Sequence, residues 1–303
     1  MSSSRFRFPA ASAAVLALVA LSLIWGYNFV VMKTVLDYVD PLDFTAARTL
    51  LGALSVFAFA LLTRQPLVRP PWRVMVLVGV LQTALFSLLI QWALVGADAG
   101  RTVVVVYSMP FWLTALAAMF LGEPLGRGRL LILLLAAVGL LLLIQPWALA
   151  ETRGLWLALG AGFIWAVAAV IQRRAPKSAG QTLLSMTAWQ LLLGALVLCL
   201  FAILLPSEAP RLEAPLFWSL AYGSLLATGV AWALWLFILE RMSAAGAGFS
   251  MLLVPVVGLS ASWLQLGERP NGASALGAAL LIAGLAAFAL IGLSNEARKR
   301  SKT

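Results

Sequence analysis

Residues 110–123 read PFWLTALAAMFLGE, and residues 255–268 read PVVGLSASWLQLGE. Each segment opens with a proline, continues through mainly apolar residues and ends in Leu-Gly-Glu. The two prolines lie 145 positions apart, and so do the two Gly-Glu pairs and the later glycines Gly139 and Gly284. Features that recur together at one fixed separation indicate an internal repeat.

Two further matches precede these segments in the same order. Ile24-Trp25 corresponds to Ile164-Trp165, and Leu50-Leu51-Gly52-Ala53-Leu54 corresponds to Leu192-Leu193-Gly194-Ala195-Leu196. The second match would be weak alone in a chain rich in alanine and leucine, but the shared order of all the matches supports two related halves.

The composition indicates an integral membrane protein. Of 303 residues, 63% are hydrophobic and only 11% are charged, and the mean hydropathy is +1.00. Soluble domains are about 45–50% apolar and about 25% charged, so this apolar excess must face lipid. The net charge of +10 could suggest nucleic-acid binding, but the basic residues form short clusters between apolar stretches. Such clusters are typical of membrane topology signals.

Ten stretches are apolar and long enough to cross a bilayer core, which takes about twenty residues. We therefore predict an all-α fold of ten transmembrane helices. The first stretch is too long for a cleaved signal peptide, whose apolar core spans roughly 7–15 residues, so we expect it to be retained. The predicted helices cover residues 11–32, 42–63, 72–95, 99–121, 128–147, 153–172, 180–205, 215–239, 243–266 and 272–293.

Five helices per half is an odd number, so the second half should enter the membrane from the opposite side. The expected organisation is an inverted repeat, with one copy in residues 1–148 and the other in 149–303, a common plan for secondary transporters. With a cytoplasmic N-terminus, fifteen of the 21 lysines and arginines fall in cytoplasmic segments and six outside. This bias predicts both termini in the cytoplasm, in a bacterial inner membrane.

At this point the residues resemble a known family. The first helix reads Ile24-Trp25-Gly26-Tyr27-Asn28-Phe29 with Lys33 after it, and the second opens with Pro41-Leu42 and carries Arg48. Together with the duplicated proline and Gly-Glu pattern, these motifs resemble the EamA-type exporters of the drug/metabolite transporter superfamily, over nearly the whole chain.

The resemblance implies a ten-helix fold with inverted repeats around a central substrate path. Substrates of this family include amino acids, their metabolites and some organic cations, and the chain looks most similar to the exporters of aromatic and neutral amino acids. In one departure from symmetry, Ala168 and Gln190 stand where the second copy would match Asn28 and Arg48.

The candidate site residues fall into three groups. Pro110 and Pro255 remove a backbone hydrogen bond and free the carbonyls of Val106 and Met251, so we expect paired hinges that line the path. Lys33 and Arg48 lie near the outer mouth, either as surface ion pairs with neighbouring aspartates or as a gate or carboxylate site. The candidates for the path itself are aromatic and polar residues within the spans, which face protein or water rather than lipid: Trp25, Asn28, Gln82, Tyr107, Ser108 and Trp165.

Several chemistries find no support in the sequence. The chain has no histidine and one cysteine, Cys199, so we predict no metal site and no cofactor. It has no Walker A loop, and Glu123 and Glu268 fall at helix ends, which favours facilitated movement over proton coupling. We expect a small-molecule substrate and no nucleic-acid partner.

The leading interpretation is an exporter of small amphipathic metabolites, of the aromatic or neutral amino-acid type, that works by alternating access and is not an enzyme. An exporter of organic cations or drugs is the alternative within transport, because aromatic faces also hold cations. A membrane-embedded enzyme is a third possibility, although the sequence offers no clustered acid, base or metal ligands for it.

Overall fold

The computed structural model describes residues 10–123, 126–147, 153–176, 178–205, 207–241 and 253–300. Every regular element in these residues is a helix. In chain order the elements are α1 (Ala10–Thr34), η1 (Val35–Asp37), α2 (Pro41–Leu62), α3 (Trp72–Val78), η2 (Gly79–Leu85), α4 (Phe86–Gly96), α5 (Ala99–Val106), α6 (Met109–Leu121), α7 (Arg127–Ile144), α8 (Arg153–Arg174), α9 (Leu183–Leu204), α10 (Ala214–Ala221), η3 (Tyr222–Val230), α11 (Ala231–Arg241), α13 (Leu253–Ala261), η4 (Ser262–Leu266) and α14 (Gly272–Arg300).

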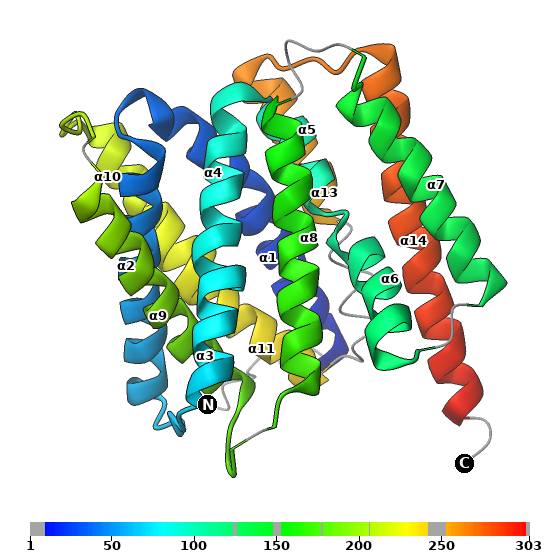
Figure 1. Cartoon of the computed structure of the whole chain (residues 1–303), viewed down its shortest axis with the longest axis horizontal. Helices are drawn as coiled ribbons and strands as arrows, with labels where there is room; N and C mark the ends of the chain where they lie inside the picture. Colours follow the sequence, from blue (N-terminus) through cyan, green and yellow to red (C-terminus); the bar gives the residue numbers. More distant parts are fainter. Residues whose placement is uncertain are drawn as a thin grey trace, which may run out of the picture.

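The helices form a bundle with two opposite faces, called here the upper and lower face as drawn in Figure 1. α5 begins at the upper face, and α6, α8 and α14 end at the lower face (Figure 1). Within the described residues, eight helical stretches are long and apolar enough to cross a membrane, and two shorter apolar helices, Leu253–Leu266 and Gly272–Phe288, follow them. The predicted ninth stretch, 243–266, lies partly outside the described residues, so the count of ten helices stays a prediction.

The bundle differs from a soluble protein in the large number of apolar side chains on its outside. Large apolar side chains are widely exposed, for example Leu62 at 85%, Ile203 at 82% and Leu264 at 83%. Alanines such as Ala53 and Ala195 are fully buried between helices. Membrane helices associate through small residues that let backbones approach, while their large apolar residues face lipid.

The predicted helix over residues 99–121 is interrupted. α5 ends at Val106, a turn follows at Tyr107 and Ser108, and Pro110 is the second residue of α6. Proline has no N–H to donate to the carbonyl of Val106, four residues earlier, and its ring clashes there. The structure therefore has an interruption next to Pro110, where two turn residues separate α5 from α6 within one apolar span, Ala99–Leu121. The role of Pro110 as a hinge stays a prediction.

Pro255 is buried near the start of α13. The residues before α13, including Met251, lie outside the described residues, so the expected kink there has no structural description.

Three of the predicted helices contain a π-helical segment within the described residues, in which hydrogen bonds span five residues rather than four. One of these segments, η4, follows α13. η2 lies between α3 and α4, and η3 lies between α10 and α11. In η3 the Thr228 hydroxyl donates to the carbonyl of Gly223, five residues earlier, at 2.8 Å. The sequence pattern predicts neither η2 nor η3, although each contains polar residues, such as Gln82 and Thr228.

At two close contacts between the halves, a glycine of one half packs against a threonine of the other, once in each direction. α2 packs against α9 and η3, and α9 packs against η2. A Cβ on Gly52 of α2 would lie 2.8 Å from the Thr228 methyl group of η3, and a Cβ on Gly194 of α9 would lie 2.6 Å from the Thr83 methyl group of η2. The Leu-Leu-Gly-Ala-Leu repeat thus places a glycine against a π-helical threonine of the opposite half.

Candidate functional site

Trp25 joins the middle of α1 to the second half of the chain. Its indole N–H donates to the carbonyl of Ala227 in η3 at 3.0 Å. Its ring lies 6.5 Å from that of Trp232 and 6.4 Å from that of Trp235, both on α11. Three tryptophans thus form one half-buried aromatic surface between α1 and α11.

Asn28, three residues after Trp25, has an unused hydrogen-bond acceptor. Its amide nitrogen donates to the Met32 sulfur at 3.1 Å, while its Oδ1 is buried and accepts no hydrogen bond. A buried acceptor without a donor costs about 1–3 kcal/mol, so Asn28 is suited to accept from a bound molecule.

Arg48 is the most unusual of the predicted residues, because its charge has no counter-ion. Its Nε is buried and unpartnered, its guanidinium carbon lies 6.0 Å from the centre of the Phe44 ring, and no described carboxylate pairs with it. The alternative of surface ion pairs has no support for Arg48 among the described residues: Asp40 accepts from the amide of Leu42 at 2.8 Å, and Asp43 accepts from the Ser207 hydroxyl at 2.5 Å.

The surroundings of Arg48 connect it to α1. A Cβ on Gly223 would lie 3.5 Å from Cδ of Arg48. The neighbouring Tyr222 donates its hydroxyl to the carbonyl of Ile24 at 2.9 Å and packs its ring 5.7 Å from that of Tyr27. Arg48 therefore lies beside Gly223 of η3, and the adjacent Tyr222 contacts α1 at Ile24 and Tyr27, the residues directly before Trp25 and Asn28.

A second polar group joins three amides. Nε2 of Gln172 on α8 donates to Oε1 of Gln82 in η2 at 2.5 Å and to Oε1 of Gln190 on α9 at 3.1 Å. The sequence predicted Gln82 but missed Gln172, which precedes Arg173 and Arg174 and so resembles a helix end. The remaining amide donors of Gln82 and Gln190 have no described acceptor.

A third group surrounds the break between α5 and α6. The Ser108 hydroxyl is fully buried without a partner, and Tyr107 is buried beside it. A Cβ on Gly162 of α8 would lie 3.0 Å from the freed carbonyl oxygen of Val106 and 3.3 Å from the Ser108 hydroxyl. Trp165, one turn further on α8, is half-buried. Gly162 was not predicted, since it lies among many small residues.

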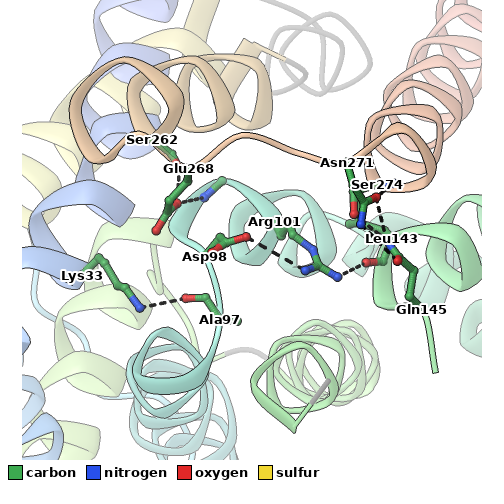
Figure 2. Close-up of polar contacts among 11 residues, drawn as sticks. Lys33, Ala97, Asp98, Arg101, Leu143, Gln145, Ser262, Glu268, Asn271 and Ser274 are labelled. Atoms are coloured by element: carbon green, nitrogen blue, oxygen red, sulfur yellow. Dashed lines mark hydrogen bonds and ion pairs between the residues drawn. The ribbon is translucent and has the colours of Figure 1, made fainter. Parts of the chain in front are cut away.

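At the upper face, Lys33 pairs with no acid in the part of the chain that the structure describes. Its ammonium donates to the carbonyls of Leu94 at 2.6 Å and Ala97 at 3.1 Å, at the end of α4. It lines a cavity of about 300 Å³ whose other lining residues are Val95, Gly96, Ala97, Asp98 and Arg101. Figure 2 shows Lys33 directed at Ala97, and Asp98 directed at Arg101, 4.0 Å away.

Glu268 and a group of polar side chains lie near the start of α5 and of α14. The Glu268 carboxylate accepts from the Ser262 hydroxyl and, at 3.3 Å, from the amide of Gly100 (Figure 2). Beyond Arg101, Gln145 donates to Asn271 at 3.0 Å and to Ser274 at 2.7 Å. The sequence treated Glu268 only as a helix-end residue and did not predict the other members of this cluster.

Comparison with known proteins identifies the family. The sequence model of the EamA-like transporter family matches residues 12–145 and, a second time, residues 152–290. This chain belongs to the EamA-like transporter family. The resemblance to the drug/metabolite transporter superfamily is thus confirmed, and the double match agrees with two related halves.

Several relatives of this EamA-family protein are known. It is 28% identical over 279 residues to "Uncharacterized transporter YoaV" of Bacillus subtilis, covering 89% of this chain and 94% of the relative. It is 29% identical over 276 residues to "Probable amino-acid metabolite efflux pump" of Salmonella typhimurium, covering 87% and 90%. A solved structure, "Crystal structure of protein", superposes with a TM-score of 0.66 at 22% identity over 92% of this chain and 96% of that one, which supports the fold alone.

The predicted site residues of this EamA-family chain do not form one cluster. Trp25, Asn28 and Arg48 lie around the contact of α1 with η3, Gln82 belongs to the three-glutamine group, and Tyr107, Ser108, Pro110 and Trp165 lie around the break in the fourth span. Lys33 lies at the upper cavity. Among the described residues no three His, Cys, Asp or Glu side chains could hold a metal ion together.

Proposed function

We propose that this protein is a secondary transporter of the bacterial inner membrane that exports small amphipathic metabolites, of the aromatic or neutral amino-acid type, by alternating access. The observation that carries the proposal is the Arg48 guanidinium, which lies seven residues inside α2 and has no counter-ion among the described residues. Seven residues correspond to about 10 Å along a helix. Charged side chains inside a membrane span are costly and mark substrate pathways.

An unpaired arginine favours a ligand that carries a carboxylate. The guanidinium binds a carboxylate through two parallel, charge-assisted hydrogen bonds. The unpartnered Oδ1 of Asn28 can accept from an ammonium group, and the tryptophans around Trp25 can hold an apolar side chain. An α-amino acid has all three features. An exporter of organic cations is disfavoured, because Arg48 would repel a cation.

The names of two relatives also support an amino-acid substrate. The Salmonella relative is named for amino-acid metabolite efflux, and a relative from Streptantibioticus cattleyicolor, 27% identical over 282 residues and covering 91% of this chain, is named "Probable terminal-alkyne amino-acid exporter". An enzymatic activity has no comparable support from relatives or residues.

The proposed architecture is ten helices in two inverted halves, residues 1–148 and 149–303. Its support is the reciprocal packing of Gly52 and Gly194 on π-helical threonines, and the left-handed glycines Gly122 (φ +67°) and Gly267 (φ +70°) that end the matched segments. The charge bias supports a cytoplasmic position for the lower face, where α14 ends.

Alternation in such a repeat exchanges the conformations of the two halves. Pro110 and Pro255 are the proposed hinges. Movement is proposed to be facilitative, because acidic residues of the described spans lie only near helix ends and the chain has no histidine.

A transport assay tests this function directly. Purified protein is reconstituted into liposomes loaded with labelled phenylalanine, leucine, their carboxamides or tetraphenylphosphonium, and efflux is compared with that from protein-free liposomes. We expect saturable efflux of the amino acids and at least about tenfold slower efflux of the carboxamides, since a tenfold ratio needs only about 1.4 kcal/mol. Efflux of the phosphonium without the amino acids would favour the cation exporter.

A further inference from the structure

The two repeated Leu-Gly-Glu motifs bring glutamates to opposite faces of the bundle, where one is paired with a cation and the other is not. Glu123, after α6 at the lower face, forms an ion pair with Arg173 at 3.1 Å. Glu268, 145 positions later, follows η4 at the upper face. It accepts from Ser262 and Gly100 and pairs with no cation of the described residues.

The partner of Glu123 has its own counterpart in the repeat. Arg173 lies in the last turn of α8, and Lys33 lies in the last turn of α1. The two are 140 positions apart, the same separation as Trp25 and Trp165. The repeat thus relates the existing pair Glu123–Arg173 to a second possible pair, Glu268–Lys33, and each pair joins one half of the chain to the other.

Lys33 and Glu268 contact backbone groups of the same short stretch of chain without pairing with each other. Lys33 donates to the carbonyl of Ala97 and Glu268 accepts from the amide of Gly100, and three residues of extended chain span at most about 11 Å. Figure 2 shows both side chains at the segment that joins α4 to α5. The cavity of about 300 Å³ lies at this face, beside the unpaired Lys33.

We propose that these residues are two alternating gate latches. In the state described here the lower latch, Glu123–Arg173, is closed and the upper latch is open. In the opposite state Glu123 separates from Arg173, and Glu268 leaves Ser262 and Gly100 to pair with Lys33 across the upper cavity. The inference rests on the alternating access proposed above, and it adds the residues that hold each face shut.

The Glu123–Arg173 ion pair is exposed to solvent, which suits a pair that forms and breaks during transport. The side chains of Arg173 and Glu123 are 49% and 44% exposed. An exposed ion pair changes an equilibrium by no more than about fivefold, so the latch biases one state and still opens in every cycle.

Cysteine accessibility tests the latches without a substrate, so failure of the amino-acid assay would not affect the result. In a Cys199→Ser background, Val95→Cys reports on the upper cavity, which Val95 lines, and Ala169→Cys reports on α8 one turn before Arg173. The measurement is the ratio of upper to lower labelling rates with a membrane-impermeant maleimide applied to each side of oriented proteoliposomes.

Glu123→Gln should lower this ratio and Glu268→Gln should raise it, each by up to about fivefold. The double variant should return to within about twofold of the parent. The controls are Glu240→Gln, whose pair with Arg241 stays within one helix, and Asp98→Asn, a carboxylate of the same upper cavity. Shifts in the same direction, no shift, or a shift with Asp98→Asn equal to that with Glu268→Gln would overturn the proposal.

Exchanging the charges of Lys33 and Glu268 distinguishes two roles for Lys33, which are pairing with Glu268 and capping α4. Lys33→Glu alone should raise the ratio, because two acids would face each other, and adding Glu268→Lys should restore it. A glutamate cannot donate to the carbonyls of Leu94 and Ala97. If Lys33 served only to cap α4, the exchanged pair would therefore not restore the ratio.

Discussion

At the scale of single residues, the unpaired Arg48 is the feature that most narrows the function. An arginine inside a span normally pairs with an acid or with backbone carbonyls, and Arg48 does neither among the described residues. Its neighbours Asp40 and Asp43 are committed to Leu42 and Ser207. The charge therefore remains available to a ligand.

Replacing Arg48 should affect substrate binding more than folding. Arg48→Gln should raise the KM for an amino-acid substrate at least about tenfold, because a hydrogen bond to a charged group is worth about 1.5–3 kcal/mol. The KM of Arg48→Lys should lie between those of the parent and of Arg48→Gln, because lysine keeps the charge but cannot form two parallel hydrogen bonds to a carboxylate. KM is measured from initial efflux rates in liposomes, and thermal unfolding in detergent should stay close to the parent.

The matched control is Arg241→Gln, because Arg241 also lies over an aromatic ring, at 3.8 Å from Phe237, but at the lower end of α11. Its KM should not change. An equal rise in KM for Arg48→Gln and Arg241→Gln, or no rise for Arg48→Gln, would contradict a carboxylate site at Arg48.

Glycines set how closely helices approach, which makes Gly194 a sensitive position. A Cβ there would lie 2.6 Å from the carbonyl oxygen of Gly79 and from the Thr83 methyl group. Overpacking of this kind costs about 1–3 kcal/mol, so Gly194→Ala should lower the unfolding temperature in detergent. Gly160→Ala is the control, because no atom lies within 4 Å of its Cβ position. Equal unfolding temperatures for the two variants would show that α9 can move away from η2.

At the scale of helices, the break at Tyr107 and Ser108 is the largest departure from regular structure in the fourth span. The sequence predicts a freed carbonyl at Val106, because Pro110 lacks an N–H. It does not predict where the helix ends or that Gly162 covers the carbonyl at close range. That contact joins residues more than fifty positions apart, and local periodicity carries no information about it.

The prolines should act as hinges in opposite senses. Pro110→Ala restores a backbone donor to Val106 and allows a continuous helix, and Pro255→Ala does the same in the other half. Each should slow efflux several-fold while leaving expression and unfolding temperature nearly unchanged. Each should also shift the labelling of Val95→Cys relative to Ala169→Cys, and the two shifts should be opposite. Two variants that transport at the parent rate would exclude the hinge.

At the scale of the whole molecule, the sequence predicts the membrane class, the family and the relation between the halves, because these rest on composition and on widely spaced motifs. It predicts less about which residues meet. Helices that are apolar on every face give no periodic signal for the side that faces the protein. Gln172 was missed because it precedes two arginines at a helix end, and its hydrogen bonds to Gln82 and Gln190 depend on the packing of α8 against η2.

The whole molecule also offers no evident proton carrier within its spans. Acidic residues of the described spans lie near helix ends, and the chain has no histidine. Efflux from liposomes should therefore continue at the same rate when the internal and external pH are equal. The rate is measured with and without an imposed pH gradient of one unit in either direction. Efflux that stops without a gradient would assign a coupling role to Glu123 or Glu268.

The π-helical segments change how insertions and deletions should act on this chain. Each residue of an α-helix turns the next by about 100°, so η2 rotates every side chain of α4 relative to the direction that an unbroken α-helix would give it. Deleting one residue between Gly79 and Leu85 could convert η2 to a regular helix of normal hydrogen bonding, yet it would swing Gln91 away from the Met32 carbonyl, to which it now donates at 2.8 Å. A one-residue gap in this segment is therefore more disruptive than the same gap in the connection between α2 and α3, even when the deleted residue is one of the apolar ones.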